Sequence, residues 1–182
     1  MPVRICKCFI AVLVSLAQPL SAGATDAGLR AKILAAFAGV RSYRVTVLGS
    51  VRSLGVWQSP NRYEMITEFE GKTVKTIIVG RALWQYDGAK WTQAGTASSN
   101  LDVDIAGLVR TIESDPRAVL TKLPDQTQDH KRVGTFEYTF ADGTEETCNY
   151  DPSTYRVTRC KADELTLLYS AYNDPSIKVV VP

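Results

Sequence analysis

Hydrophobic and polar positions alternate through residues 56–93, and turn-forming pairs interrupt the alternation. Glu70-Gly71 and Asp87-Gly88 each lie between two alternating segments. An acidic residue followed by glycine favours a two-residue hairpin turn, because glycine readily adopts the positive φ that such turns need. The pattern therefore predicts a run of short antiparallel strands joined by tight turns.

The apolar positions around Glu70-Gly71 share one face of the predicted hairpin: Tyr63, Met65, Thr67, Phe69, Val74, Thr76 and Ile78. The charged residues Arg62, Glu64 and Glu68 take the other face, as in a sheet with one dry and one solvated side. Symmetry about Asp87-Gly88 predicts the pairs Trp84–Trp91 and Tyr86–Ala89 in the second hairpin.

Further alternating segments extend the predicted sheet. Pro60 marks a turn or an edge, because proline cannot donate to a strand ladder, and Asp142-Gly143 marks another turn. We expect about ten strands in total. The additional ones are residues 42–49, 54–58, 133–140, 145–150, 156–163, 165–172 and 177–181.

Helical periodicity appears in three places. Residues 26–39 repeat apolar side chains at Leu29, Ile33, Phe37 and Val40, with Asp26 and Gly39 suited to the two ends. Residues 101–112 and 115–123 predict a helical pair inserted between sheet segments. Two interpretations of that pair stay open: plain core packing, or a lid over a half-barrel.

The first 24 residues are typical of a secretory signal peptide. Arg4 and Lys7 precede an apolar segment about a dozen residues long, and Ala22-Gly23-Ala24 forms a cleavage site ending at Ala24. Cys6 and Cys8 precede the apolar segment instead of lying at the cleavage site, so no lipobox cysteine is available for acylation. We therefore expect a soluble, unlipidated periplasmic protein. Residues 25–182 then form one domain without a membrane-spanning segment.

Composition narrows the class of partner. The chain has 21 basic and 19 acidic residues, and loss of Arg4 and Lys7 brings the basic count to 19. A mature chain without net charge disfavours nucleic acid as a partner. Cys148 and Cys160 remain, and a lone pair in an exported chain predicts a disulfide. They face each other if the intervening loop spans 151–157, which we favour over a tight turn that offsets them.

Several positions resemble a known superfamily. Val56, Trp57, Pro60, Asn61 and Tyr63, followed by Trp84 and Tyr86, are similar to motifs of the periplasmic lipoprotein carrier LolA and its relatives LolB, LppX and the RseB amino-terminal domain. Tyr172-Asn173-Asp174-Pro175 resembles the ending of that family. The resemblance implies a half-open barrel that holds an apolar ligand. Where the carriers have an arginine that latches the lid, this chain has Ser59.

The sequence lacks a nucleophile elbow, a phosphate-binding glycine loop and a metal-ligand spacing. The single histidine, His130, lies in a polar stretch at 126–131 predicted to be a surface linker. We expect a non-enzymatic protein without a cofactor or a metal.

The predicted fold is α+β, with one strongly bent antiparallel sheet, a half-open barrel, wrapped around two or three helices. We expect a monomeric carrier or chaperone for a lipid, acyl chain or lipoprotein. The alternative is a sensor or protein-interaction module with a filled core and a partner at the inner or outer membrane. The candidate cavity-lining residues are Tyr43, Val45, Val47, Trp57, Tyr63, Met65, Ile78, Trp84, Trp91, Phe136, Tyr138 and Phe140.

Overall fold

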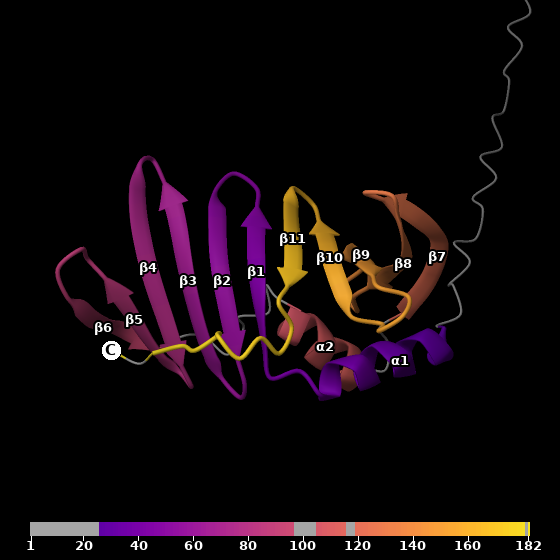
Figure 1. Cartoon of the computed structure of the whole chain (residues 1–182), viewed down its shortest axis with the longest axis horizontal. Coiled ribbons are helices and arrows are strands. Elements are labelled where there is room, and N and C mark those ends of the chain that lie inside the picture. Colours follow the sequence, from indigo (N-terminus) through magenta and orange to yellow (C-terminus); the bar gives the residue numbers. More distant parts are fainter. Residues whose placement is uncertain (1–25, 97–104, 116–118, 181) are drawn as a thin grey trace, which may run out of the picture.

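The computed structural model describes residues 26–96, 105–115, 119–180 and 182. The predicted signal peptide and its cleavage site lie outside these ranges. An open, curved sheet of eleven antiparallel strands dominates the described part, with two helices against one face (Figure 1). The strand bounds are β1 Ser42–Leu48, β2 Arg52–Gln58, β3 Arg62–Phe69, β4 Lys72–Val79, β5 Ala82–Tyr86, β6 Trp91–Thr96, β7 Val119–Gln128, β8 Lys131–Thr139, β9 Glu145–Tyr150, β10 Val157–Ala162 and β11 Leu165–Ser170.

The strand order is β6-β5-β4-β3-β2-β1-β11-β10-β9-β8-β7. The first and last strands therefore pair at the centre, and two meanders extend from them to opposite edges. The chain passes from edge strand β6 to edge strand β7 through the stretch that contains α2, Ile105–Ser114. The expected α+β half-open barrel is confirmed, with eleven strands and two described helices.

Helix α1, Ala27–Ala38, begins and ends where the sequence predicts. The Asp26 carboxylate accepts a hydrogen bond from the Leu29 amide at 2.8 Å, and Gly39 caps the other end. Leu29 and Ile33 are buried, so the apolar stripe packs on the sheet. Val109 and Ile112 of α2 are also buried, and both helices lie below the β11–β7 half of the sheet in Figure 1.

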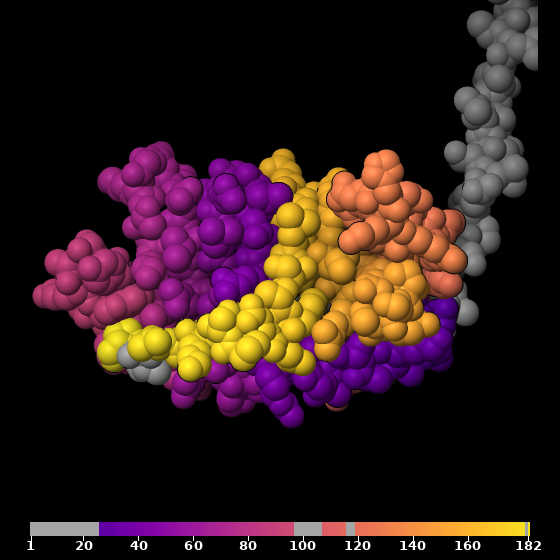
Figure 2. Space-filling view, in the orientation of Figure 1, coloured from indigo at the N-terminus to yellow at the C-terminus, as the bar shows by residue number. Residues whose placement is uncertain are grey.

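Strand pairing defines two faces, because directly paired residues share a face. We call inner the face on which Trp57 packs against Phe37 of α1, with ring centroids 6.2 Å apart. The opposite, outer face carries residues 174–180 of the C-terminal segment, whereas Tyr172 lies on the inner side, with its ring centroid 5.9 Å from that of Tyr43. Figure 2 shows this yellow segment lying across the strands. The Val179 amide donates to the Gln58 side chain of β2 at 3.1 Å.

The hairpin at Glu70-Gly71 is confirmed, since both residues have positive φ and Phe69 pairs with Lys72. The predicted helix over 115–123 is wrong, because residues 119–123 lie in β7. Val119 and Thr121 are β-branched, and pairing with β8 gives their backbone a ladder. Pro124 is tolerated because β7 is an edge strand and bulges between Leu123 and Gln126.

Two further expectations need correction. Residues 126–131 are not a linker: β7 runs to Gln128, and Asp129-His130 forms a hairpin turn with φ of 50° and 62°. His130 is exposed there, as expected. The predicted last strand over 177–181 is also wrong, because the segment through residue 180 forms no ladder. The other strands and the Asp142-Gly143 turn are confirmed.

Candidate functional site: the inner face of the sheet

The inner face gathers most of the predicted cavity-lining side chains. Cross-strand pairing links Tyr43 to Trp57, Trp57 to Tyr63 and Tyr63 to Ile78. A second series of cross-strand pairs begins with Val47 and Leu167. It continues from Leu167 to Cys160, from Cys160 to Cys148, and from Cys148 to Phe136. The predicted residues on this face are Tyr43, Val45, Val47, Trp57, Tyr63, Met65, Ile78, Phe136, Tyr138 and Phe140.

Trp84 and Trp91 were expected on the same face and lie on the outer one. Trp84 pairs with Ile77, and Trp91 pairs with Tyr86 at a ring-centroid distance of 5.3 Å. The predicted two-residue turn is a four-residue loop instead. The Asp87 carboxylate accepts hydrogen bonds from the Ala89 and Lys90 amides, each at 2.9 Å, which stabilises the wider loop. The two extra loop residues move the partner of Trp91 from Trp84 to Tyr86 without changing its face. The outer position of Trp84 follows from the tight β4–β5 turn, which pairs it with Ile77.

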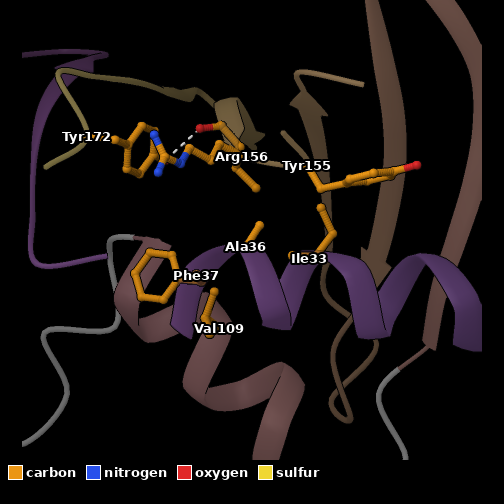
Figure 3. A pocket seen from close by; sticks show the side chains of 8 residues that line it. Ile33, Ala36, Phe37, Val109, Tyr155, Arg156 and Tyr172 are labelled. Carbon is orange, nitrogen blue, oxygen red and sulfur yellow. Dashed lines mark hydrogen bonds between the residues drawn. The ribbon is translucent and has the colours of Figure 1, made fainter. Parts of the chain in front are cut away.

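Among the described residues, the helix-covered half of the inner face is closely packed with the protein's own side chains. Tyr43 stacks on Trp57 with ring centroids 5.1 Å apart, and Phe37 contacts both rings. Figure 3 shows the crevice left between α1, Val109 of α2 and Tyr172. Its volume is about 10 Å³, which is close to the space of a single water molecule. This crevice is too small for a lipid chain.

The other half of the inner face keeps apolar side chains exposed. Phe69 is 52 % exposed and Val74 is 40 % exposed, while Met65 and Leu83 are half-buried. We call these four residues the open inner patch. They belong to β3, β4 and β5, and neither described helix lies below these strands in Figure 1. Apolar side chains in such a concave, partly open position are available to a ligand.

Gly55 shapes the floor between the two halves. A Cβ atom there would lie 2.8 Å from the Tyr63 hydroxyl oxygen and 2.9 Å from a Val45 methyl carbon. The Tyr63 ring therefore lies across β2, over the missing side chain. Its hydroxyl reaches the Met65 sulfur at 4.0 Å. The alternation pattern alone did not reveal this close packing, although a glycine within a strand signals such an approach.

Two polar side chains interrupt the inner face at β8 and β9. Tyr138 is 1 % exposed, and its hydroxyl has no hydrogen-bond partner among the described residues. Burial raises its pKa to about 12. Glu146 pairs with Tyr138 across the strands, and burial raises the pKa of its carboxyl. Glu146 was not among the predicted site residues, although it alternates with Cys148 and Tyr150.

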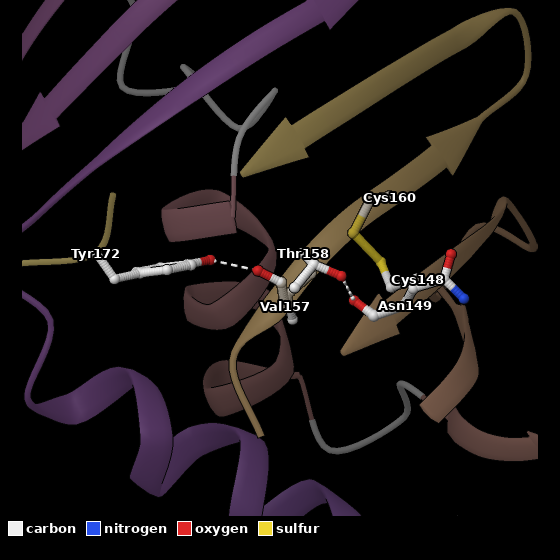
Figure 4. Close-up of a disulfide and its surroundings, with 6 residues drawn as sticks. All are labelled: Cys148, Asn149, Val157, Thr158, Cys160 and Tyr172. Atoms are coloured by element: carbon white, nitrogen blue, oxygen red, sulfur yellow. Dashed lines mark hydrogen bonds between the residues drawn. A yellow bond between two sulfur atoms is a disulfide. The ribbon is translucent and has the colours of Figure 1, made fainter. Parts of the chain in front are cut away.

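The predicted disulfide is formed between Cys148 and Cys160, which pair directly across β9 and β10 (Figure 4). The wider of the two loops considered is correct, since the strands stop at Tyr150 and resume at Val157. A carboxylate oxygen of Glu146 and both sulfurs lie within 4.8 Å of one another. Metal binding by cysteine needs thiolates, and the S–S bond leaves none there.

Comparison with solved structures identifies the fold. LprF from Mycobacterium bovis superposes with a TM-score of 0.58 at 14 % identity, over 88 % of this chain and 98 % of LprF. A LolA superfamily protein from Nitrosomonas europaea gives 0.37 at 12 % identity, over 86 % of this chain and 96 % of that chain. A lipoprotein-sorting domain from Vibrio parahaemolyticus gives 0.40 at 9 %, over 83 % and 93 %.

The last two scores add no argument, and the similarity to LprF concerns the fold alone. No protein-family model and no curated protein sequence matches the chain. The half-open-barrel fold expected from the motifs around Trp57 and Tyr63 is confirmed.

Proposed function

We propose that this protein is a non-enzymatic carrier that holds an apolar ligand, such as a lipid or an acyl chain, against the open inner patch. The observation that carries the proposal is the exposure of Phe69 and Val74 on the inner face, beyond the helix-covered half. Large apolar side chains in a concave surface are the usual lining of a site for an apolar ligand.

The patch can supply enough free energy for such a role. Each buried methylene group contributes ~0.8 kcal/mol, so an acyl chain gains several kcal/mol even after ordering costs. Met65 and Leu83 continue the apolar surface from Phe69 and Val74 toward Tyr63. Tyr63 connects this surface to the helix-covered half of the inner face. An acyl chain lying along this path contacts mainly apolar side chains and requires few charged groups of the protein.

A second function is supported by the tight crevice between α1, α2 and Tyr172. That half of the core needs no ligand to be filled, as expected of a sensor or protein-interaction module. In that case the open inner patch would meet a protein rather than a lipid. The two functions differ in what the purified protein retains.

The proposed compartment is the periplasm. Residues 1–24 carry the pattern of an export signal, and a Cys148–Cys160 disulfide suits an oxidising compartment. Among the described residues no helix is long and apolar enough to span a membrane.

Native mass spectrometry of the mature, oxidised protein tests the carrier function, with organic extraction of any bound molecule. A dansyl-labelled fatty acid then measures uptake. We expect wild type to take up the probe and the double variant Phe69→Gln/Val74→Gln to lose about tenfold in affinity, or about 1.4 kcal/mol. Leu48→Gln is the matched control, because Leu48 is 38 % exposed on the outer face.

An apo mass together with no uptake by wild type would rule out the carrier. Equal losses in the double variant and in Leu48→Gln would show that the inner face is not the site. A retained protein in place of a lipid would favour the interaction module.

A further inference from the structure

Charge is distributed unequally between the two faces of strands β1–β6, which the structure describes without a gap. Cross-strand pairing assigns six charged side chains to the outer face: Arg44, Arg52, Arg62, Glu64, Glu68 and Lys75. On the inner face of these strands Lys72 alone is charged. The remaining polar side chains on that face are uncharged: Ser53, Thr67, Thr76, Gln85 and Thr92.

Lys72 lies where the open inner patch meets solvent. It is the first residue of β4, next to the Glu70-Gly71 turn, and it is exposed. Figure 1 shows this turn at the end of the strands that lies farthest from both helices. Phe69 pairs with Lys72 across the strands, and Val74 follows two residues along the same face. The two most exposed side chains of the patch therefore flank a single cation.

The charge of Lys72 is not balanced on its own face. Lys75 of the same strand pairs with Glu64 on the outer face, with the Nζ atom 3.6 Å from the carboxylate. Lys72 has no such ion pair with any described residue. Ser53 and Thr67, deeper on the inner face, share a hydrogen bond of 2.9 Å and so do not require a polar ligand. An anion beside Lys72 would meet no carboxylate on this face.

The patch continues inward from Lys72 along β4. Ile78 lies at the inner end and pairs with Tyr63 on one side and Leu83 on the other. The six residues of strand from Lys72 to Ile78 span about 20 Å. One leaflet of a bilayer supplies about half of its ~30 Å hydrocarbon core, so one acyl chain needs about 15 Å. The path is therefore long enough for a single chain.

We infer that the ligand is a single-chain amphiphile with one negative charge at its head, which is the chemistry of a fatty-acid carboxylate. The inference rests on the proposed carrier function and adds the charge and the direction of the ligand. The head group binds Lys72 in water at the Glu70-Gly71 turn, and the tail runs toward Tyr63. A lysine ammonium attracts an anion while remaining hydrated, and it repels a cationic head group.

Displacement of N-phenylnaphthylamine, an uncharged fluorescent probe of apolar sites, tests the inference on the mature, oxidised protein at neutral pH and low salt. The competitors are decanoate, decanol and decylamine, which share one alkyl chain. We expect wild type to bind decanoate about tenfold more tightly than decylamine. Lys72→Met should weaken decanoate about fivefold and leave decanol unchanged, and Lys72→Glu should reverse the preference. Lys75→Met is the matched control, because it removes the same charge from the outer face of the same strand.

Equal affinities of wild type for decanoate and decylamine would overturn the inference. An unchanged affinity of Lys72→Met for decanoate would do the same, and so would an equal loss in Lys75→Met, since net charge would then attract the anion. In each case probe uptake by wild type, and its loss in Phe69→Gln/Val74→Gln, would still support the carrier function. Absence of probe uptake by wild type would overturn both, so the two failures are distinguishable.

Discussion

Cys160 lies directly opposite Cys148, with the Cα atoms 4.1 Å apart, because β10 carries an extra residue at the bulge. Tyr150 pairs with Val157, and Asn149 pairs with Arg159, so Thr158 is left without a partner in the ladder. Its hydroxyl donates to the Asn149 carbonyl at 3.4 Å (Figure 4). If the register set by Tyr150 and Val157 continued without a bulge, Cys148 would oppose Arg159 and the disulfide would be misaligned.

The double variant Cys148→Ala/Cys160→Ala should lower the free energy of unfolding by about 3 kcal/mol. The two cysteines are 12 residues apart, and closing such a loop restricts the unfolded chain by roughly that amount. Urea denaturation of both proteins measures the difference. Reductant should destabilise wild type and leave the double variant unchanged; an equal response of the two proteins would contradict the expectation.

Gly134→Ala should destabilise the protein by about 2–3 kcal/mol. A Cβ atom at position 134 would lie 2.1 Å from the Tyr150 ring, which covers this glycine from the neighbouring strand. Gly39→Ala is the matched control, because no atom lies within 4 Å of a Cβ there and its φ is −90°. The control should change stability by no more than about 0.5 kcal/mol. Similar melting temperatures for both variants would refute the packing argument.

Asn173→Ala should cost about 2 kcal/mol of stability. The Asn173 carboxamide accepts from the Arg41 amide at 2.6 Å and donates to the Gly39 carbonyl at 3.1 Å. Its φ of 58° also disfavours alanine. Asn173→Gly relieves the backbone cost while losing both hydrogen bonds, so an intermediate stability is expected. If glycine and alanine are equally destabilising in thermal unfolding, backbone conformation does not contribute.

Two tyrosine hydroxyls should respond in opposite directions. The Tyr138 hydroxyl is buried without a hydrogen-bond partner in the described part of the chain, so Tyr138→Phe should be neutral or stabilise by up to about 1 kcal/mol. The Tyr172 hydroxyl donates to the Val157 carbonyl at 2.6 Å, so Tyr172→Phe should cost about 1 kcal/mol. Guanidinium unfolding curves of the two variants check this. A loss of stability in Tyr138→Phe would reveal a partner for its hydroxyl.

Glu146→Gln should stabilise the protein at neutral pH and have little effect in acid. Burial raises the pKa of the Glu146 carboxyl, so the folded state favours the protonated form and loses stability as pH rises through the usual and then the raised pKa. The side chain is partly solvated, which limits the gain to about 1 kcal/mol, or ~2–4 °C in melting temperature. Scanning calorimetry at pH 7 and at about pH 3.5 measures the difference. A gain of equal size at both pH values would exclude ionisation as its cause.

Local patterns predicted most of the fold correctly. The Asp26 cap, the Glu70-Gly71 turn and the alternation of Phe136 with Tyr138 each depend on neighbouring residues alone. The motif around Trp57 and Tyr63 pointed to the right fold. These features can be predicted from the sequence because backbone φ preferences and side-chain alternation are properties of a few consecutive residues.

The errors share a physical origin in contacts between distant residues. Residues 119–123 form a strand because β8 offers a ladder. Trp84 lies on the outer face because the tight turn between β4 and β5 pairs it with Ile77, and Trp91 follows it there because it pairs with Tyr86. The end of the chain could not be predicted, because Ile177 and Val179 pack across strands instead of beside one.

The sequence by itself determined the strand-rich meander, the first helix and the pairing of the two cysteines, since each follows from local periodicity or a small set of residues. Only the tertiary structure decided which aromatic side chains share the inner face and where apolar surface stays open. A shift of one residue in a strand moves every side chain to the other face. The faces, and with them the candidate sites, therefore depend on loop lengths and bulges that are stabilised by contacts across the fold.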